Sequence, residues 1–165
     1  MIVTGEAVAK WVAEKCGAEY THACRAIGWL SNGKLETAMM YDSYTGASIA
    51  MHARVESAEK VQREWLFSIF DYPFNQLGVK RVTALVPEDN KRSLSSCKHL
   101  GWKYETVLKD YFPNCDGIVL VMRKEDCQWL KFKKRTSKGL ANALQSFNNA
   151  ARTSLPETWE EVTNP

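Results

Sequence analysis

The chain has 165 residues, of which 45% are hydrophobic and 25% charged, and its formal net charge is +3 at pH 7. This length and composition predict a single globular domain with a core of its own and exclude a disordered chain. The net charge is too small to indicate nucleic-acid binding by itself.

The cysteines and the apolar segments narrow the class further. Five cysteines are widely spaced and include no CxxC pair, so we predict neither a disulfide framework nor a bound metal. No apolar stretch approaches the roughly 20 residues that span a bilayer. The first residues lack the basic start and apolar run of a signal peptide. We therefore expect a cytoplasmic protein without membrane contact.

The first third of the chain predicts one helix followed by strands. Thr4 is a suitable N-cap for a helix whose apolar positions include Val8 and Val12, and Gly17 is placed to end it. The hydrophobic period then becomes that of strands with short turns between them. The expected antiparallel strands are residues 23–30, 35–41 and 47–55.

The next segments predict a crossover. Apolar residues at helical spacing follow residue 55, and Gly78 is placed to end this second helix. A β-rich run at 80–86 follows, and a helix between two strands favours a parallel pair. Strands 47–55 and 80–86 are therefore predicted to be parallel neighbours. A short helix ending at Gly101 and a hairpin of residues 102–111 and 117–123 complete the domain.

The composition changes after residue 130, so we predict a domain at 1–130 and a separate segment at 131–165. This segment starts with a basic hinge, continues as a short amphipathic helix and ends in an acidic tail. A lone helix this short is unstable, so it should pack on its own domain, on a second copy or on another protein. The basic hinge is better explained by a solvated linker than by nucleic-acid binding.

Residues 70–102, with the run Asp-Tyr-Pro-Phe-Asn-Gln-Leu-Gly-Val-Lys-Arg-Val, and residues 120–130 carry a family pattern. It resembles the GNAT superfamily of N-acyltransferases, in particular the GNAT-like proteins of tailed bacteriophages. The resemblance covers about residues 8–130. It implies an α+β, three-layer fold: a mixed, mostly antiparallel sheet with a central, splayed parallel pair and helices on both faces.

The resemblance also implies a cofactor, acetyl-CoA, because in that superfamily the thioester lies between the two splayed strands. Its pyrophosphate then meets backbone N–H groups at the start of the following helix. Here the splay would lie between strands 47–55 and 80–86. The residues implied to bind the cofactor are Ala53, Val55, Lys60, Val61, Gln62, Arg63, Asn90 and Ser93.

The segment 57–63 departs from the family, whose pyrophosphate loop is glycine-rich so that backbone approaches phosphate closely. This chain has no glycine between Gly46 and Gly78. Glu59 adds negative charge there, which Lys60 and Arg63 can offset.

Direct transfer to an amine requires a base, and His52 and Glu56 are the candidates near the predicted splay. Histidine suits the task because its ordinary pKa is near ~6.5. Ser93 matches a serine that some GNAT enzymes place near the CoA sulfur, where a hydroxyl can donate to the leaving thiolate. Asn90 is also a good N-cap without any ligand. Cys97 stands where many members carry a proton-donating tyrosine, although a buried cysteine is usually a small hydrophobe.

The sequence thus predicts an N-acetyltransferase that moves an acetyl group from acetyl-CoA to an amine acceptor by direct transfer. The acceptor stays open between a protein N-terminus, a lysine side chain and a small amine. The alternative is a GNAT-fold protein that has lost catalysis and serves as a structural or binding component, such as a phage virion protein or a host-factor binder, docking through residues 131–165. The missing loop glycines and the absent tyrosine favour this alternative.

Overall fold

A computed structural model describes residues 1–57 and 61–131 of the chain. The predicted tail helix and acidic end, and Lys60 of the predicted cofactor loop, lie outside the described residues. A partner bound through residues 131–165 therefore stays a prediction. In chain order the elements are β1 (Ile2–Thr4), α1 (Glu6–Cys16), β2 (Arg25–Ser31), β3 (Lys34–Asp42), β4 (Ser48–Val55), α2 (Arg63–Asp71), the π-helical turn η2 (Tyr72–Gln76), β5 (Arg81–Pro87), α3 (Lys91–Leu100), β6 (Lys103–Phe112), β7 (Cys115–Arg123) and the short 3-10 helices η3 (Lys124–Asp126) and η4 (Gln128–Lys131).

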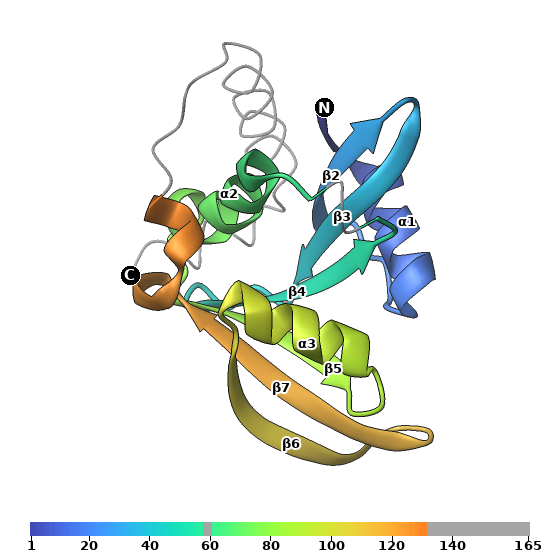
Figure 1. The fold of residues 1–165 in the computed structure, drawn as a ribbon, viewed down its shortest axis with the longest axis vertical. Coiled ribbons are helices and arrows are strands. Elements are labelled where there is room, and N and C mark those ends of the chain that lie inside the picture. Colours follow the sequence, from blue (N-terminus) through green and yellow to red (C-terminus); the bar gives the residue numbers. More distant parts are fainter. Residues whose placement is uncertain (58–60, 132–165) are drawn as a thin grey trace.

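The strands form one mixed sheet in the order β1-β2-β3-β4-β5-β7-β6. All neighbours are antiparallel except β4 and β5, which are parallel and are joined by the crossover through α2. The predicted meander and the predicted parallel pair are therefore confirmed. Helices α1 and α2 lie on opposite sides of β2–β4, and α3 lies over β5 and β7 (Figure 1). The predicted α+β layers are confirmed as well.

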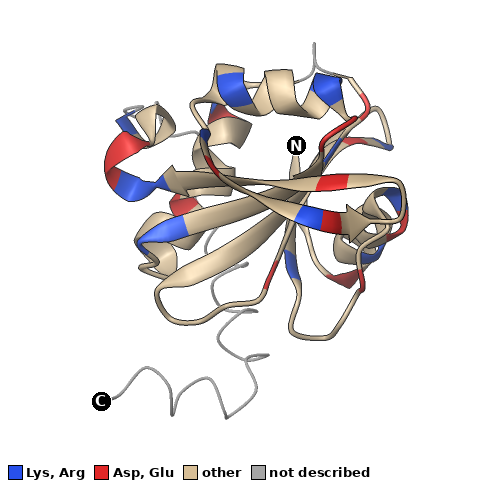
Figure 2. Ribbon diagram, turned by 90° about the horizontal axis from the view of Figure 1, so that it is seen from below, with Lys and Arg blue, Asp and Glu red and all other residues tan. Residues whose placement is uncertain are grey.

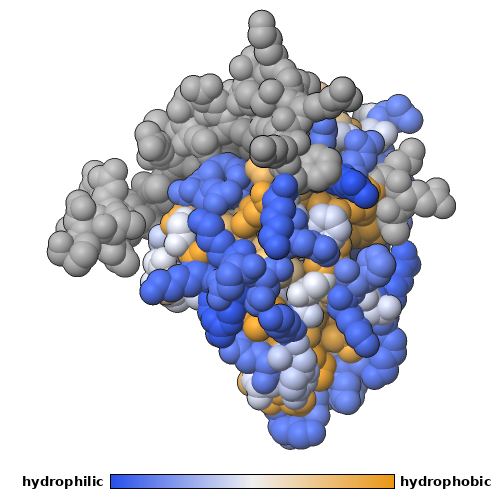
Figure 3. Space-filling model, turned by 60° about the vertical axis from the view of Figure 1, so that its left-hand side comes forward, coloured by the Kyte–Doolittle hydropathy of each residue, from blue (hydrophilic) through white to orange (hydrophobic). Residues whose placement is uncertain are grey.

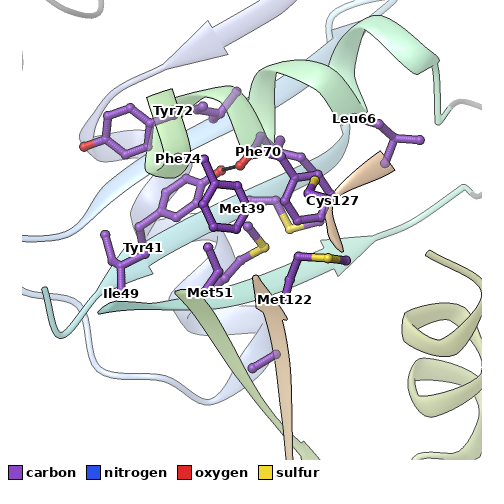
Figure 4. Close-up of a cluster of buried hydrophobic side chains, with 14 of the residues drawn as sticks. Met39, Tyr41, Ile49, Met51, Leu66, Phe70, Tyr72, Phe74, Met122 and Cys127 are labelled. Atoms are coloured by element: carbon purple, nitrogen blue, oxygen red, sulfur yellow. Dashed lines mark hydrogen bonds between the residues drawn. The ribbon is translucent and has the colours of Figure 1, made fainter. Parts of the chain in front are cut away.

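Alternation along each strand divides the buried side chains between the two faces of the sheet. The larger core lies on the face covered by α2 and α3, where Phe70 and Phe74 pack above Met39 and Met51 (Figure 4). The smaller core lies under α1 on the opposite face. Its buried members are Val8, Ala9, Val12, Ala13, Cys24, Ala26, Ala38 and Met40.

The N-terminus differs from the prediction. Thr4 is not a helix cap but the last residue of β1, and the N-cap position belongs to Gly5, which makes no side-chain capping bond. A strand of three residues is too short for its alternation to be read from sequence. The predicted stop at Gly17 is confirmed, because this residue adopts the left-handed conformation, with φ 64°.

The second helix also begins later than predicted. The sequence predicts helical structure after residue 55, whereas α2 begins at Arg63 with Gln62 as its N-cap. Pro73 has no backbone N–H, and the helix continues as the wider turn η2 up to Gln76. Gly78, with φ 75°, then ends the segment as predicted.

Acidic and basic residues are interspersed over the described ribbon rather than gathered by sign (Figure 2). The edge strand β6 exposes Tyr104, Leu108 and Tyr111. Apolar side chains reach the surface between hydrophilic ones at this end of the molecule (Figure 3). Within residues 1–57 and 61–131, no helix is long and apolar enough to cross a bilayer.

Candidate active site

The parallel strands β4 and β5 pair over only part of their length. Their register holds three residue pairs, the last of which joins Ala50 to Thr83. Strand β4 nevertheless continues along β3 up to Val55, and β5 continues along β7 up to Pro87. Each strand therefore follows its outer neighbour away from the other beyond Ala50 and Thr83. The predicted splayed pair is confirmed.

The separation leaves one edge of β4 without β5 beside it. The Glu56 N–H donates to the Glu36 carbonyl at 2.9 Å, in the same register that joins β4 to β3. Because successive residues of a strand direct their backbone groups to opposite sides, Ala53 and Val55 direct theirs away from β3. The Ala53 carbonyl accepts a hydrogen bond from the Cys16 thiol at 3.3 Å. Two residues predicted to bind the cofactor thus lie on the open edge.

The side chains of β4 divide between the two faces of the sheet. Met51 belongs to the core under α2. His52 is the next residue and lies opposite Met40, a member of the core under α1. His52 therefore lies on the α1 face, two residues beyond the last β4–β5 pair.

His52 is paired with a carboxylate that sequence reasoning missed. Its Nε2 lies 2.8 Å from Asp42 Oδ2, and the two side chains are 30% and 24% exposed. The hydrogen bond from His52 lowers the pKa of Asp42, with burial opposing it in part. The predicted strand 35–41 stops one residue short of Asp42, whereas Asp42 is the last residue of β3, opposite Ala50. The pair could be predicted only from the register of β3 and β4, and the sequence does not fix the length of the turn on which that register depends.

This pairing predicts a pH-dependent contribution to stability. The folded-state pKa of Asp42 is lowered, so its contribution is present above the ordinary carboxyl pKa of ~3.9 and is lost as the pH falls through the folded value. The Asp42→Asn variant should be less stable than the parent by about 1 kcal/mol at pH 5, and this deficit should be smaller at pH 2. Urea unfolding at both pH values measures the difference. The Asp110→Asn variant is the control, and an Asp42→Asn deficit that is the same at both pH values contradicts the assignment.

Glu56, the second candidate base, is engaged elsewhere. Its Oε1 accepts a hydrogen bond from Arg54 Nε at 3.0 Å. This bond is the main reason why the pKa of Glu56 is lowered. The structure thus places both candidate bases on β4 or directly after it, His52 with Asp42 and Glu56 with Arg54.

The start of α3 holds the next two predicted residues. Asn90 Oδ1 accepts a hydrogen bond from the Ser93 N–H at 3.1 Å, so the predicted N-cap is confirmed. Leu94 and Cys97 of the same helix pack against the core shared with α2. Burial raises the pKa of Cys97 to about 11, so its thiol stays protonated at neutral pH. Ser93 thus stands on a helix that covers the face opposite to His52.

The N-cap role of Asn90 predicts which substitutions of this residue lower the stability of the protein. The Asn90→Ala variant should lose about 1 kcal/mol of unfolding free energy, because the Ser93 N–H loses its acceptor. The Asn90→Asp variant should retain most of this stability, since a carboxylate also caps a helix N-terminus. Thermal or urea unfolding checks both. Equal losses in the two variants would contradict the capping role.

The start of α2 offers backbone donors on the same face as α3. The Leu66 N–H donates to the Gln62 carbonyl, which closes the first helical turn. The N–H groups of the first turn precede this bond and point out of the N-terminal end of the helix. Gln62 makes no side-chain capping bond, and Val61 packs against the core just before it. Val61, Gln62 and Arg63 belong to the predicted cofactor loop.

The described residues also form a hollow of about 710 Å³ at the turn between β6 and β7. None of the predicted site residues lines it, so it is not the site that the family resemblance implies. Its lining residues are Glu88, Asp110, Tyr111, Phe112, Pro113, Asn114, Cys115 and Asp116.

Neither a protein-family model nor a curated protein matches the sequence. Solved structures do match. A chimera of the spermidine N-acetyltransferase SpeG from Vibrio cholerae and hSSAT has a TM-score of 0.62 at 13% identity, over 79% of this chain and 98% of that one. Mutant forms of the spermidine/spermine N-acetyltransferase SpeG from the same organism give 0.63 at 12%, over 81% and 99%. A dodecameric structure of the V. cholerae enzyme gives 0.63 at 12%, over 76% and 94%.

These neighbours are acetyltransferases of the GNAT fold, and the likeness shows that this chain has the same fold. The predicted fold is confirmed on this point too. The likeness does not bear on a phage origin.

Proposed function

We propose that this chain is an N-acetyltransferase that moves an acetyl group from acetyl-CoA directly to an amine. The observation that carries the proposal is the separation of the parallel strands β4 and β5 beyond Ala50 and Thr83. The fold shared with the SpeG acetyltransferases supports the same reaction class. The acceptor is an amine of a class that the fold does not define.

The residues around the separation fit acetyl-CoA. The open edge of β4 at Ala53 and Val55 offers main-chain donors and acceptors for an extended chain that contains amide groups. The start of α2, where Gln62 makes no side-chain capping bond, would favour an anionic pyrophosphate, with Lys60 and Arg63 as countercharges. When bound, acetyl-CoA supplies an activated acetyl group, whose C–S bond breaks as the C–N bond to the amine forms.

The remaining predicted residues fall on the two sides of the sheet. Asn90 and Ser93 lie at the start of α3, on the side of the α2 terminus, where they would orient the cofactor. There the Ser93 hydroxyl would donate a hydrogen bond to the CoA sulfur as it leaves. His52 lies on the α1 face and would accept a proton from the acceptor ammonium. We prefer His52 to Glu56 as the base because Glu56 is held by Arg54.

The full chain, incubated with acetyl-CoA and a panel of amines, tests the proposal. The panel consists of free lysine, a peptide with a free N-terminus, and spermidine. Mass spectrometry of each amine and the release of the CoA thiol measure transfer. We expect one class to be acetylated in proportion to the thiol released. A folded chain that binds acetyl-CoA but acetylates none of the three classes argues against transfer, and one that does not bind it favours the structural alternative.

A further inference from the structure

We infer that Asp42 is a positioning residue that holds the His52 imidazole with Nδ1 as its basic nitrogen for deprotonating the acceptor amine. The inference rests on the proposed function and adds to it a residue from the neighbouring strand. The contact that carries it is the 2.8 Å hydrogen bond between His52 Nε2 and Asp42 Oδ2.

The pair is built into the sheet by two adjacent strands. His52 faces Met40 across the β3–β4 ladder, and Asp42 faces Ala50, so the two side chains are diagonal neighbours on one face. Both side chains are partly buried, which limits the conformations open to each. Within residues 1–57 and 61–131, the ring of His52 has no hydrogen-bond partner besides Asp42.

Other charged groups on this face do not compete for the imidazole. Arg54, two residues further along β4, is bonded to Glu56. At the end of α1, Lys15 lies beside Glu14, and the thiol of Cys16 is bonded to a backbone carbonyl. Asp42 is thus the carboxylate that acts on His52.

The pairing fixes the chemistry of the two ring nitrogens. An ionised carboxylate can only accept a hydrogen bond, so the proton of the neutral ring is on Nε2. The lone pair is then on Nδ1, and this nitrogen can take a proton from the ammonium form of the acceptor. As the amine nitrogen bonds to the acetyl carbon and the C–S bond breaks, the second amine proton ends on the CoA sulfur. The proton on Nδ1 returns to solvent, which balances the exchange.

The location of the pair makes it more than a surface contact. His52 lies two residues beyond the point at which β4 and β5 separate, and its neighbour Ala53 provides part of the open edge. An amine bound on the α1 face near this edge would lie beside His52. Asp42 is one strand further away and would act only through the imidazole.

A double-mutant cycle tests the inference on the full chain. We expect Asp42→Asn to lower kcat by 10- to 100-fold and to leave the KM for acetyl-CoA within about twofold. In the His52→Ala background, adding Asp42→Asn should change kcat by less than about twofold, because Asp42 acts through the ring. Asp110→Asn makes the same change, from a carboxylate to an amide, in the β6–β7 hairpin. It is the matched control and should leave kcat unchanged.

Nitrogen-15 NMR of the histidine rings provides a second readout that a merely structural role would not change. In the parent protein the His52 ring should be the Nε2–H tautomer, and in Asp42→Asn both tautomers should be populated. An Asp42→Asn variant with parental kcat and an unchanged tautomer overturns the inference. So does an Asp42→Asn substitution that lowers kcat by the same factor in the His52→Ala background as in the parent. If His52→Ala itself keeps full activity, the assignment of the base is wrong. If the parent transfers no acetyl group, the proposed function is wrong and the inference falls with it.

Discussion

Replacement of His52 by alanine is expected to lower kcat for acetyl transfer by about 100- to 10,000-fold, the usual contribution of a general base. The acceptor amine is protonated near neutral pH and cannot attack until it loses a proton. His52 lies just beyond the separation of β4 and β5, with Asp42 bonded to its Nε2. The release of the CoA thiol under saturating acetyl-CoA measures the loss.

His99→Ala is the matched control, because His99 is an exposed histidine on α3. It should keep parental kcat. Binding of acetyl-CoA to His52→Ala should stay within about threefold of the parent, since the ring is on the face opposite to the starts of α2 and α3. A His52→Ala variant with parental activity would show that the base lies elsewhere, and Glu56→Gln would then be the next variant to measure.

Replacement of Ala53 by tryptophan is expected to weaken acetyl-CoA binding by at least about 100-fold, or more than about 2.7 kcal/mol. The Ala53 side chain is exposed and lies on the face of β4 that α2 and α3 share, beyond the last residue that pairs with β5. A large ring there would occupy the space beside the open edge. Because this edge is not paired with β5, the substitution should cost little stability.

Thr106→Trp places the same ring on the exposed edge strand β6, away from the separation. It should bind acetyl-CoA like the parent. Calorimetric titration of both variants, with circular dichroism to verify folding, measures the difference. If Ala53→Trp binds as tightly as Thr106→Trp, the cofactor does not lie along β4.

Local pattern was enough to predict the central elements of this fold. The Asn32–Gly33 turn has both residues at positive φ, as a tight hairpin requires, and it joins β2 and β3 as predicted. The apolar run at β5 and the helix before it were enough to predict the parallel pair. These features depend on interactions between residues that are close in the sequence.

Features that depend on distant strands could not be predicted in this way. Strand β7, and not β6, lies beside β5. This order could not be predicted, because the sequence pattern of the two strands does not indicate which of them pairs with β5. The Asp42–His52 pair depends on the register across the turn between β3 and β4. The start of α2 at Arg63 was misplaced because Val61 has helical spacing with Trp65 although it precedes the helix.

The two faces of the sheet give the proposed reaction its arrangement. The starts of α2 and α3 lie on one face, where we propose that the anionic cofactor binds, and His52 with Asp42 lies on the other. Strands β4 and β5 separate between these two sets of residues. The proposed roles of Ala53, Val55, Asn90 and Ser93 depend on this one feature.

Isothermal titration of the full chain with acetyl-CoA tests that feature most directly. If β4 and β5 part beyond Ala50 and Thr83 to admit a thioester, we expect one molecule to bind per chain with a Kd below about 1 mM. This Kd corresponds to a binding free energy of about −4 kcal/mol or more favourable. A folded chain that takes up no heat at millimolar acetyl-CoA contradicts the proposal that the parted strands hold this cofactor.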